Sequence, residues 1–153
     1  MALSFPYFPV PLGRTLKPII PVIFAHVTLE DQYIAYGALV DSGADLSIVT
    51  RAAASSLGLH PVGPPTRTRG IGGSVEMWNT ECDIILARGA EAYRLTVPVQ
   101  VVGPDGDDPP FPLLGRKGVF DRFDVTFRER RLRVELAAKD PTLRRVHLSK
   151  ALR

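Results

Sequence analysis

The sequence predicts a single, mostly β domain with many turns and one or two short helices. The chain has 153 residues, which is enough to bury a core without disulfides or bound metals. Its 14 prolines and 13 glycines favour short strands and turns over a helical bundle. The contents of apolar residues, 45%, and of charged residues, 23%, are those of an ordinary globular protein.

The charge, the cysteine content and the N-terminal residues limit the classes of protein that fit this sequence. The net charge of +3 does not demand a nucleic-acid partner. Cys82 is the only cysteine, so no intramolecular disulfide can form and the chain suits a reducing compartment. The apolar N-terminus is interrupted by Pro6, Pro9 and Pro11 and is preceded by no positive region, so it is a poor signal peptide. It is also too short and broken for a membrane span. We therefore expect a cytoplasmic protein with no membrane or nucleic-acid partner.

The beginning of the chain predicts an arm and two strands. Residues 1–17 are rich in proline and show no clear period, which predicts an irregular N-terminal arm. Residues 18–29 are rich in β-branched side chains and predict a strand, part of which Pro21 confines to a sheet edge. Residues 33–40 return as a second strand that ends at Asp41.

A capped helix and a glycine-rich hairpin follow. Thr50 can cap a short helix over residues 51–57, and Gly58 suits its C-terminal stop. Residues 66–86 predict a hairpin with residues 70–73 at its tip. Three glycines in these four residues suit a backbone that bends, moves or approaches a ligand closely. The alternative is an ordinary flexible turn.

The next segments are strands, a loop and a short helix. Residues 81–86 and 93–102 predict two more strands, and residues 117–123 predict a short helix. The loop at residues 103–110 carries three carboxylates, but it lacks the ligand spacing of a calcium loop. We expect it to be a solvated acidic loop.

The end of the chain predicts a last hairpin and a basic tail. Residues 124–128 and 131–136 alternate enough to form the hairpin. Beyond it, Asp140 and Pro141 are typical of a helix start. A docking element or a disordered segment are the alternatives. The expected organisation is an N-terminal arm over residues 1–17, a folded domain over residues 18–136, and a basic tail able to form a helix over residues 137–153.

One stretch, residues 38–49, combines apolar runs with a carboxylate, a hydroxyl and a glycine. Asp41 lies where an apolar strand leaves the core, and aspartate is rarely buried without partners. Gly43 allows a tight turn, and the Ser42 hydroxyl can hold a carboxylate by a hydrogen bond. Taken alone, Asp-Ser-Gly is most simply a strand followed by an Asx or Ser turn.

Three motifs in order resemble the retropepsin-like aspartic proteases. Residues 39–45, Leu-Val-Asp-Ser-Gly-Ala-Asp, resemble the active-site motif of this family. Residues 69–73, Arg-Gly-Ile-Gly-Gly, are similar to its flap tip, and residues 111–116, Phe-Pro-Leu-Leu-Gly-Arg, to its late apolar-apolar-Gly-Arg segment. The resemblance covers residues 18–136. It implies a closed β-barrel of the retropepsin type and an aspartic endopeptidase that binds an extended polypeptide.

The single copy of Asp-Ser-Gly has a mechanistic consequence. Peptide hydrolysis without a metal or a covalent intermediate can use two adjacent carboxyl groups that share one proton. The chain supplies Asp41, while Asp45, by the resemblance, points elsewhere. The second carboxylate must then be Asp41 of another copy, brought into place by a two-fold axis. We therefore expect a homodimer that needs no cofactor and no metal.

The resemblance also assigns roles to individual residues. Asp41 would be the catalytic carboxylate, and Asp45 would pair with Arg116, whose fork geometry suits a carboxylate. The residues expected to support the active-site loop are Ser42, Gly43, Leu114 and Gly115. The residues expected to bind substrate are Gly43, Ala44, Asp45, Gly70, Ile71, Gly72 and Gly73.

The chain also departs from the family pattern. Ser42 replaces the threonine that is usual in viral members, and Arg69 stands where they have a glycine. Both termini are extended, so the dimer contacts of viral members cannot be carried over. Two alternatives therefore stay open: a non-catalytic retropepsin-fold module for peptide binding or dimerisation, and an unrelated small β-barrel whose basic tail binds nucleic acid.

Overall fold

Strands account for about half of the protein in a computed structural model that describes residues 2–10 and 13–153. The helical segments are few and short. They are α1 (Arg51–Leu57), α2 (Leu148–Ala151), and two irregular turns, η1 (Arg116–Phe120) and η2 (Glu129–Arg131). The strands are β1 (Leu3–Pro6), β2 (Phe8–Pro9), β3 (Leu16–Lys17), β4 (Ile19–Ala25), β5 (Tyr33–Val40), β6 (Ser47–Ile48), β7 (Thr66–Gly70), β8 (Gly73–Arg88), β9 (Glu91–Val102), β10 (Leu113–Leu114), β11 (Phe123–Arg128), β12 (Arg133–Ala138) and β13 (Arg145–His147).

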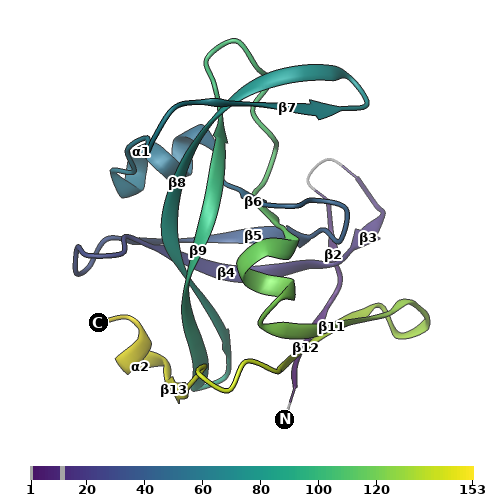
Figure 1. Ribbon diagram of the computed structural model, residues 1–153. Helices are drawn as coiled ribbons and strands as arrows, with labels where there is room; N and C mark the ends of the chain where they lie inside the picture. Colours follow the sequence, from purple (N-terminus) through teal and green to yellow (C-terminus); the bar gives the residue numbers. More distant parts are fainter. Residues whose placement is uncertain (1, 11–12) are drawn as a thin grey trace.

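The main sheet closes on itself. Its strand order is β13-β9-β6-β10-β5-β4-β8-β7, and an additional pairing of β8 with β9 joins its two sides (Figure 1). The closed part is a barrel of six strands, with β7 and β13 outside the ring. This confirms the predicted mostly β fold with a closed barrel.

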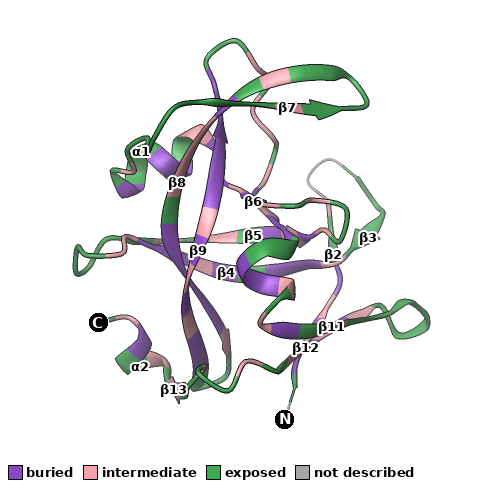
Figure 2. Cartoon of the chain, in the orientation of Figure 1, coloured by how far each residue is buried: buried purple, intermediate pink, exposed green. Residues whose placement is uncertain are grey.

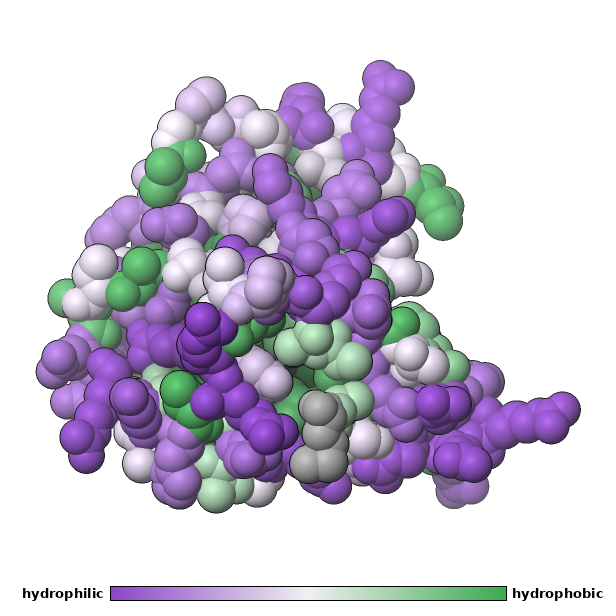
Figure 3. Space-filling model, turned by 60° about the horizontal axis from the view of Figure 1, so that its bottom comes forward, coloured by the Kyte–Doolittle hydropathy of each residue, from purple (hydrophilic) through white to green (hydrophobic). Residues whose placement is uncertain are grey.

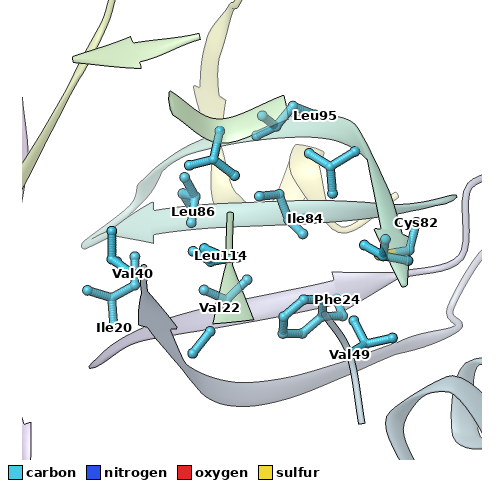
Figure 4. Close-up of a cluster of buried hydrophobic side chains, with 14 of the residues drawn as sticks. Ile20, Val22, Phe24, Val40, Val49, Cys82, Ile84, Leu86, Leu95 and Leu114 are labelled. Atoms are coloured by element: carbon cyan, nitrogen blue, oxygen red, sulfur yellow. The ribbon is translucent and has the colours of Figure 1, made fainter. Parts of the chain in front are cut away.

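Alternation along the strands builds one principal core inside this barrel. Figure 2 shows buried and exposed residues alternating along several strands, as expected of strands with one face turned inward. Cys82 is fully buried in β8, where it packs as a small apolar side chain. The side chains labelled at the centre of this core are Ile20, Val22, Phe24, Val40, Val49, Cys82, Ile84, Leu86, Leu95 and Leu114 (Figure 4).

Helix α1 begins and ends as the sequence predicts. The Thr50 hydroxyl accepts a hydrogen bond from the Ala53 N–H at 3.1 Å, and Gly58 adopts a left-handed conformation with φ of 65°. Ala53 and Leu57 are buried against the barrel. The helix therefore stabilises the strand connection immediately after β6.

Pro21 marks the point where β4 changes from an edge strand to an inner strand. It is opposite Gly37 of β5, while the pairing of β4 with β8 begins only at Ile23. Pro21 has no N–H to donate, and it lies where β8 makes no ladder contact. The predicted edge position is confirmed.

The N-terminal segment is more ordered than the expected irregular arm. Strand β1 pairs with β12, with Leu3 opposite Leu136 and Phe5 opposite Val134, in a three-stranded sheet ordered β1-β12-β11. Phe5 is fully buried. The expectation of an irregular arm is therefore wrong for β1, because alternate side chains of this short strand enter the core. Residues 1, 11 and 12 of that arm lie outside the described residues.

Two predicted helices are also corrected. No helix starts at Asp140; its carboxylate instead accepts hydrogen bonds from the Thr142 N–H and hydroxyl, at 2.8 and 2.7 Å, which closes a turn. The tail then pairs with β9 through β13 and ends in α2, where Ala151 is buried. The predicted helix at residues 117–123 is a single irregular turn, η1, interrupted at Gly118, whose φ is 92°.

The surface is mixed. Hydrophilic residues surround several smaller hydrophobic patches on the face shown in Figure 3, one of them near the centre of the view. Among the described residues, no helix is both long and apolar enough to cross a membrane.

Candidate active site

Asp41 lies at the end of β5, at a point fixed by a strand from much later in the chain. Leu39 and Val40 pair in parallel with Leu113 and Leu114 of β10. The Asp41 N–H donates to the Leu114 carbonyl at 3.0 Å, which ends the ladder at this residue. The aspartate is partly buried, so its carboxylate lies at the boundary between the barrel core and the surface.

The turn after Asp41 is an Asx turn. The Gly43 N–H donates to Asp41 Oδ1 at 2.9 Å, and the Ala44 N–H donates to the Asp41 carbonyl at 3.3 Å. Ser42 is exposed, and its hydroxyl makes no hydrogen bond to the described residues. The Asx-turn interpretation and the catalytic interpretation of Asp41 are therefore compatible, because the turn holds one oxygen of the candidate catalytic carboxylate in place.

Gly115 and Ser47 fix the base of this active-site loop (residues 41–46). The Gly115 N–H donates to the fully buried Ser47 hydroxyl at 3.0 Å. A Cβ on Gly115 would clash with the carbonyl group of Leu46 and lie 2.8 Å from the Ser47 nitrogen. The close approach of the two segments thus requires glycine. Gly115 was predicted from the sequence, whereas Ser47 was missed, because its only signal is one hydroxyl beside an apolar run.

Two backbone hydrogen bonds complete the support of the loop. The Arg116 N–H donates to the Ala44 carbonyl at 2.8 Å, and the Lys117 N–H donates to the Asp45 carbonyl at 2.9 Å. Asp45 and Arg116 are exposed and line one pocket. Within the described chain, however, their side chains form no ion pair within 4.0 Å. The two backbones therefore meet as expected without the predicted side-chain pair.

The glycine-rich segment forms the tip of a two-stranded flap hairpin (residues 66–77). Gly70 pairs with Gly73, which leaves Ile71 and Gly72 as the turn, and Gly73 has a φ of 115°. Ile71 is fully exposed. Figure 1 shows β7 and the start of β8 projecting beyond the body of the barrel. Ile71, at the tip, is therefore not packed against the rest of the described chain.

A polar contact holds the base of the flap hairpin to the barrel. Gln100 of β9 donates from Nε2 to the Thr66 hydroxyl at 3.2 Å and to Asn79 Oδ1 at 3.0 Å. Gln100 is buried, so these bonds replace lost contacts with water. The hairpin consequently has an anchored base and a glycine-rich tip.

A pocket of about 370 Å³ separates the flap hairpin from the strand that leaves the active-site loop. Ile48 of β6, Asp107 and Pro109 line it together with residues of the flap hairpin. From the sequence, Asp107 and Pro109 were expected in a solvated loop and were missed as site residues. No local signal could place them here, because the pocket forms only when the flap hairpin and the loop meet in the fold.

Other reactive groups are not placed for chemistry. Desolvation by burial, followed by repulsion from Asp83 and Glu81, raises the pKa of the Cys82 thiol to about 12. A buried thiol of that kind is a poor nucleophile. Among the described residues, no group of three or more His, Cys, Asp or Glu side chains is placed to hold a metal ion.

Comparisons with known proteins identify a family model and two solved structures to which the chain is similar. A family model described as aspartyl protease matches residues 25–117. A crystal structure of a retropepsin-like aspartic protease from Rickettsia conorii aligns with a TM-score of 0.52 and 17% identity, over 89% of this chain and 91% of that one. The EIAV protease in complex with the inhibitor HBY-793 aligns with a TM-score of 0.45 and 26% identity, over 65% of this chain and 82% of that one. No curated protein matches the sequence.

The Rickettsia structure supports the fold, a barrel of the retropepsin type. The family model covers well over half of the chain, and the matched range includes Asp41, the flap hairpin and Arg116. The chain therefore belongs to the aspartyl protease family.

Proposed function

We propose that this protein is an aspartic endopeptidase that works as a homodimer. The single observation that carries the proposal is the setting of Asp41, a partly buried carboxylate at a strand end, held by the Leu114 carbonyl and the Gly43 N–H. Membership of the aspartyl protease family supports the protease chemistry. The single copy of the Asp-Ser-Gly motif in the chain supports the dimer.

The chemistry follows from two copies of Asp41 around a two-fold axis. Like charges a few ångströms apart cannot both ionise easily, so the two carboxyl groups share one proton and titrate as a unit. The ionised carboxylate removes a proton from water as the water attacks the peptide carbonyl, and the protonated one donates a hydrogen bond to the developing oxyanion. The C–N bond then breaks as the proton taken from water passes to the amide nitrogen, which leaves one proton shared by the pair. The fixed Oδ1 of Asp41 would hold this geometry before substrate arrives.

The substrate would lie as an extended strand between the flap hairpin and the active-site loop. Backbone groups near Ala44 and Asp45 would hold it from below, and the tip around Ile71 would close over it and exclude water. The exposed Ser42 hydroxyl has no partner among the described residues, which suits a hydrogen bond across the two-fold axis. Arg116 would then form an ion pair with Asp45 once substrate or the second chain has reduced the screening of their charges by solvent.

The dimer contacts must differ from those of a protease that pairs through its chain ends. Here β1 is paired with β12, and β13 is paired with β9, both within one chain. The two-fold axis must nonetheless pass beside the active-site loop, because the two Asp41 carboxylates have to meet. The exposed Ser42 and Ile71 are therefore expected at or near the interface.

Cleavage of a mixed peptide library from about pH 4 to 7, with wild type beside Asp41→Asn, tests this proposal. The asparagine keeps the shape of the side chain and removes the acid. We expect cleavage by the wild type alone, with a specific activity that rises with protein concentration as dimers form. Equal cleavage by the variant would refute the proposal. Binding of peptides without cleavage at any pH would favour the non-catalytic peptide-binding module instead.

A further inference from the structure

We propose that Asp107 makes this protease prefer substrates with a lysine or arginine side chain next to the scissile bond. The inference rests on the proposed function and specifies its substrate class. It is carried by the pocket between the flap hairpin and β6, in which one carboxylate belongs to an otherwise uncharged lining.

The pocket lies where a substrate side chain would enter. It is lined by the flap hairpin and by Ile48, which directly follows the Ser47 that supports the active-site loop. Met77 and Val102, both almost completely buried, line it together with Pro109. A side chain from an extended substrate over the active-site loop would therefore meet apolar walls first.

Asp107 is the one charged side chain among the described residues that line this pocket. It is exposed and has no ion pair within 4.0 Å in the described chain. Two arginines of the flap hairpin, Arg67 and Arg69, do not neutralise the Asp107 carboxylate. Side chains alternate along a strand, and Thr68 lines the pocket, so its two arginine neighbours point to the opposite face of β7. Arg67 donates instead to the Ser74 hydroxyl at 3.2 Å.

The loop that carries Asp107 is held rigidly on both sides of it. The Arg51 guanidinium donates from Nη1 to the carbonyls of Gly103 and Gly106, both at 2.8 Å. The Arg51 N–H donates to the two carboxylate oxygens of Asp108, both at 3.1 Å. Asp107 therefore lies between two residues that Arg51 holds, so its backbone is positioned without the entropic cost of ordering a mobile loop.

Close packing fixes the same loop against the flap hairpin. A Cβ on Gly106 would clash with the side chains of Val102 and Val75. The Gly103 N–H also donates to the Glu76 carbonyl at 2.8 Å. These contacts hold the backbone of the loop on either side of Asp107 against the flap hairpin.

A largely apolar lining with one carboxylate suits a long basic side chain. Lysine and arginine lay their methylene stems along apolar surface and keep the charged head at the edge. The head would then form a charge-assisted hydrogen bond with Asp107, partly screened from water by the closed flap. An acidic side chain in the same position would be repelled.

The test compares peptides that differ at a single position near the scissile bond, occupied by lysine, by norleucine or by glutamate. Norleucine matches the length of the lysine stem without its charge. We expect wild type to cleave the lysine peptide with kcat/KM about 3 to 10 times that of the norleucine peptide, a range suited to a partly exposed ion pair. Asp107→Asn should bring the two values together, and Asp107→Lys should favour glutamate.

Asp105→Asn is the matched control, because it removes a carboxylate from the same loop at a position that lines a different pocket. It should keep the lysine preference. An unchanged preference in Asp107→Asn, equal loss in Asp105→Asn, or no lysine preference in wild type would each overturn the inference.

A binding measurement separates this inference from the proposed function. If wild type cleaves no peptide, the proposed function fails, and fluorescence anisotropy with the same labelled peptides then decides the pocket's role. Tighter binding of the lysine peptide to wild type, lost in Asp107→Asn and kept in Asp105→Asn, supports the pocket. Equal binding of the lysine and norleucine peptides, or no binding at all, contradicts it.

Discussion

Replacing Gly115 with alanine should destabilise the protein strongly, because two backbone segments meet at this residue. The added Cβ would clash with the Leu46 carbonyl group and lie 2.8 Å from the Ser47 nitrogen. Side-chain rotation cannot relieve these contacts, since the atoms belong to backbone. The active-site loop and β10 would have to move apart.

The expected loss has two parts. Overpacking a well-filled site costs about 1–3 kcal/mol, and backbone contacts place this case near the upper end. Separation of the segments would also break the bond from the Gly115 N–H to the buried Ser47 hydroxyl. Leaving such a donor unpaired costs about 1–3 kcal/mol. We therefore expect the free energy of unfolding to fall by about 3–5 kcal/mol.

Urea unfolding at one fixed protein concentration measures this loss, with Gly70→Ala as the matched control. A Cβ on Gly70 would meet no atom within 4 Å, so that variant should differ from wild type by less than about 0.5 kcal/mol. The fixed concentration matters because dimerisation stabilises the folded state by mass action. A Gly115→Ala variant within about 1 kcal/mol of wild type would refute the reasoning, because it would mean that the two segments separate easily.

Three further predictions concern stability. Thr50→Ala removes the N-cap of α1 and should cost about 1 kcal/mol in chemical denaturation, whereas Thr50→Ser should restore most of it. Asp83→Ala removes a buried carboxylate that contacts Arg94 at 2.7 Å and the Thr96 hydroxyl at 2.6 Å. It should lower the free energy of unfolding by about 3–5 kcal/mol, and a loss below about 1 kcal/mol would show that water replaces the carboxylate. Burial raises the pKa of Cys82 from 9.0 to about 12, so as pH rises the thiol ionises in the unfolded chain before it ionises in the folded one. The free energy of unfolding of wild type relative to Cys82→Ala should therefore fall as pH rises from about 9 to about 12. A pH-independent difference between these two proteins would contradict the last prediction.

Local signals in the sequence predicted those parts of the fold that depend on neighbours along the chain. The cap at Thr50, the stop at Gly58 and the hairpin tip at Ile71 are all where their residue types demand. Gly115 could be assigned to the support of the active-site loop because the resemblance related it to Asp41. The close approach of Gly115 to Leu46 could not be predicted from the sequence, because the pattern of residue types does not encode the distance between two segments.

The features that were missed depend on partners far along the chain. Strand β1 is short and contains proline, and Phe5 lies opposite Val134, which is far along the chain. Asp140 is an exception, because its carboxylate closes a local turn with Thr142 instead of starting a helix, but the tail that follows pairs with the distant strand β9. The position of Asp107 depends on the long-range contact of its loop with Arg51.

The most direct test of the central claim is an activity measurement on mixtures of wild type with Asp41→Asn, after the subunits have exchanged. If the active site uses one Asp41 from each chain, a mixed dimer is inactive, and activity falls with the square of the wild-type fraction. An equal mixture should then keep about a quarter of the activity of an all-wild-type sample of the same total concentration. An equal mixture that keeps about half would show that each chain works with its own carboxylate alone, and would contradict the shared dyad.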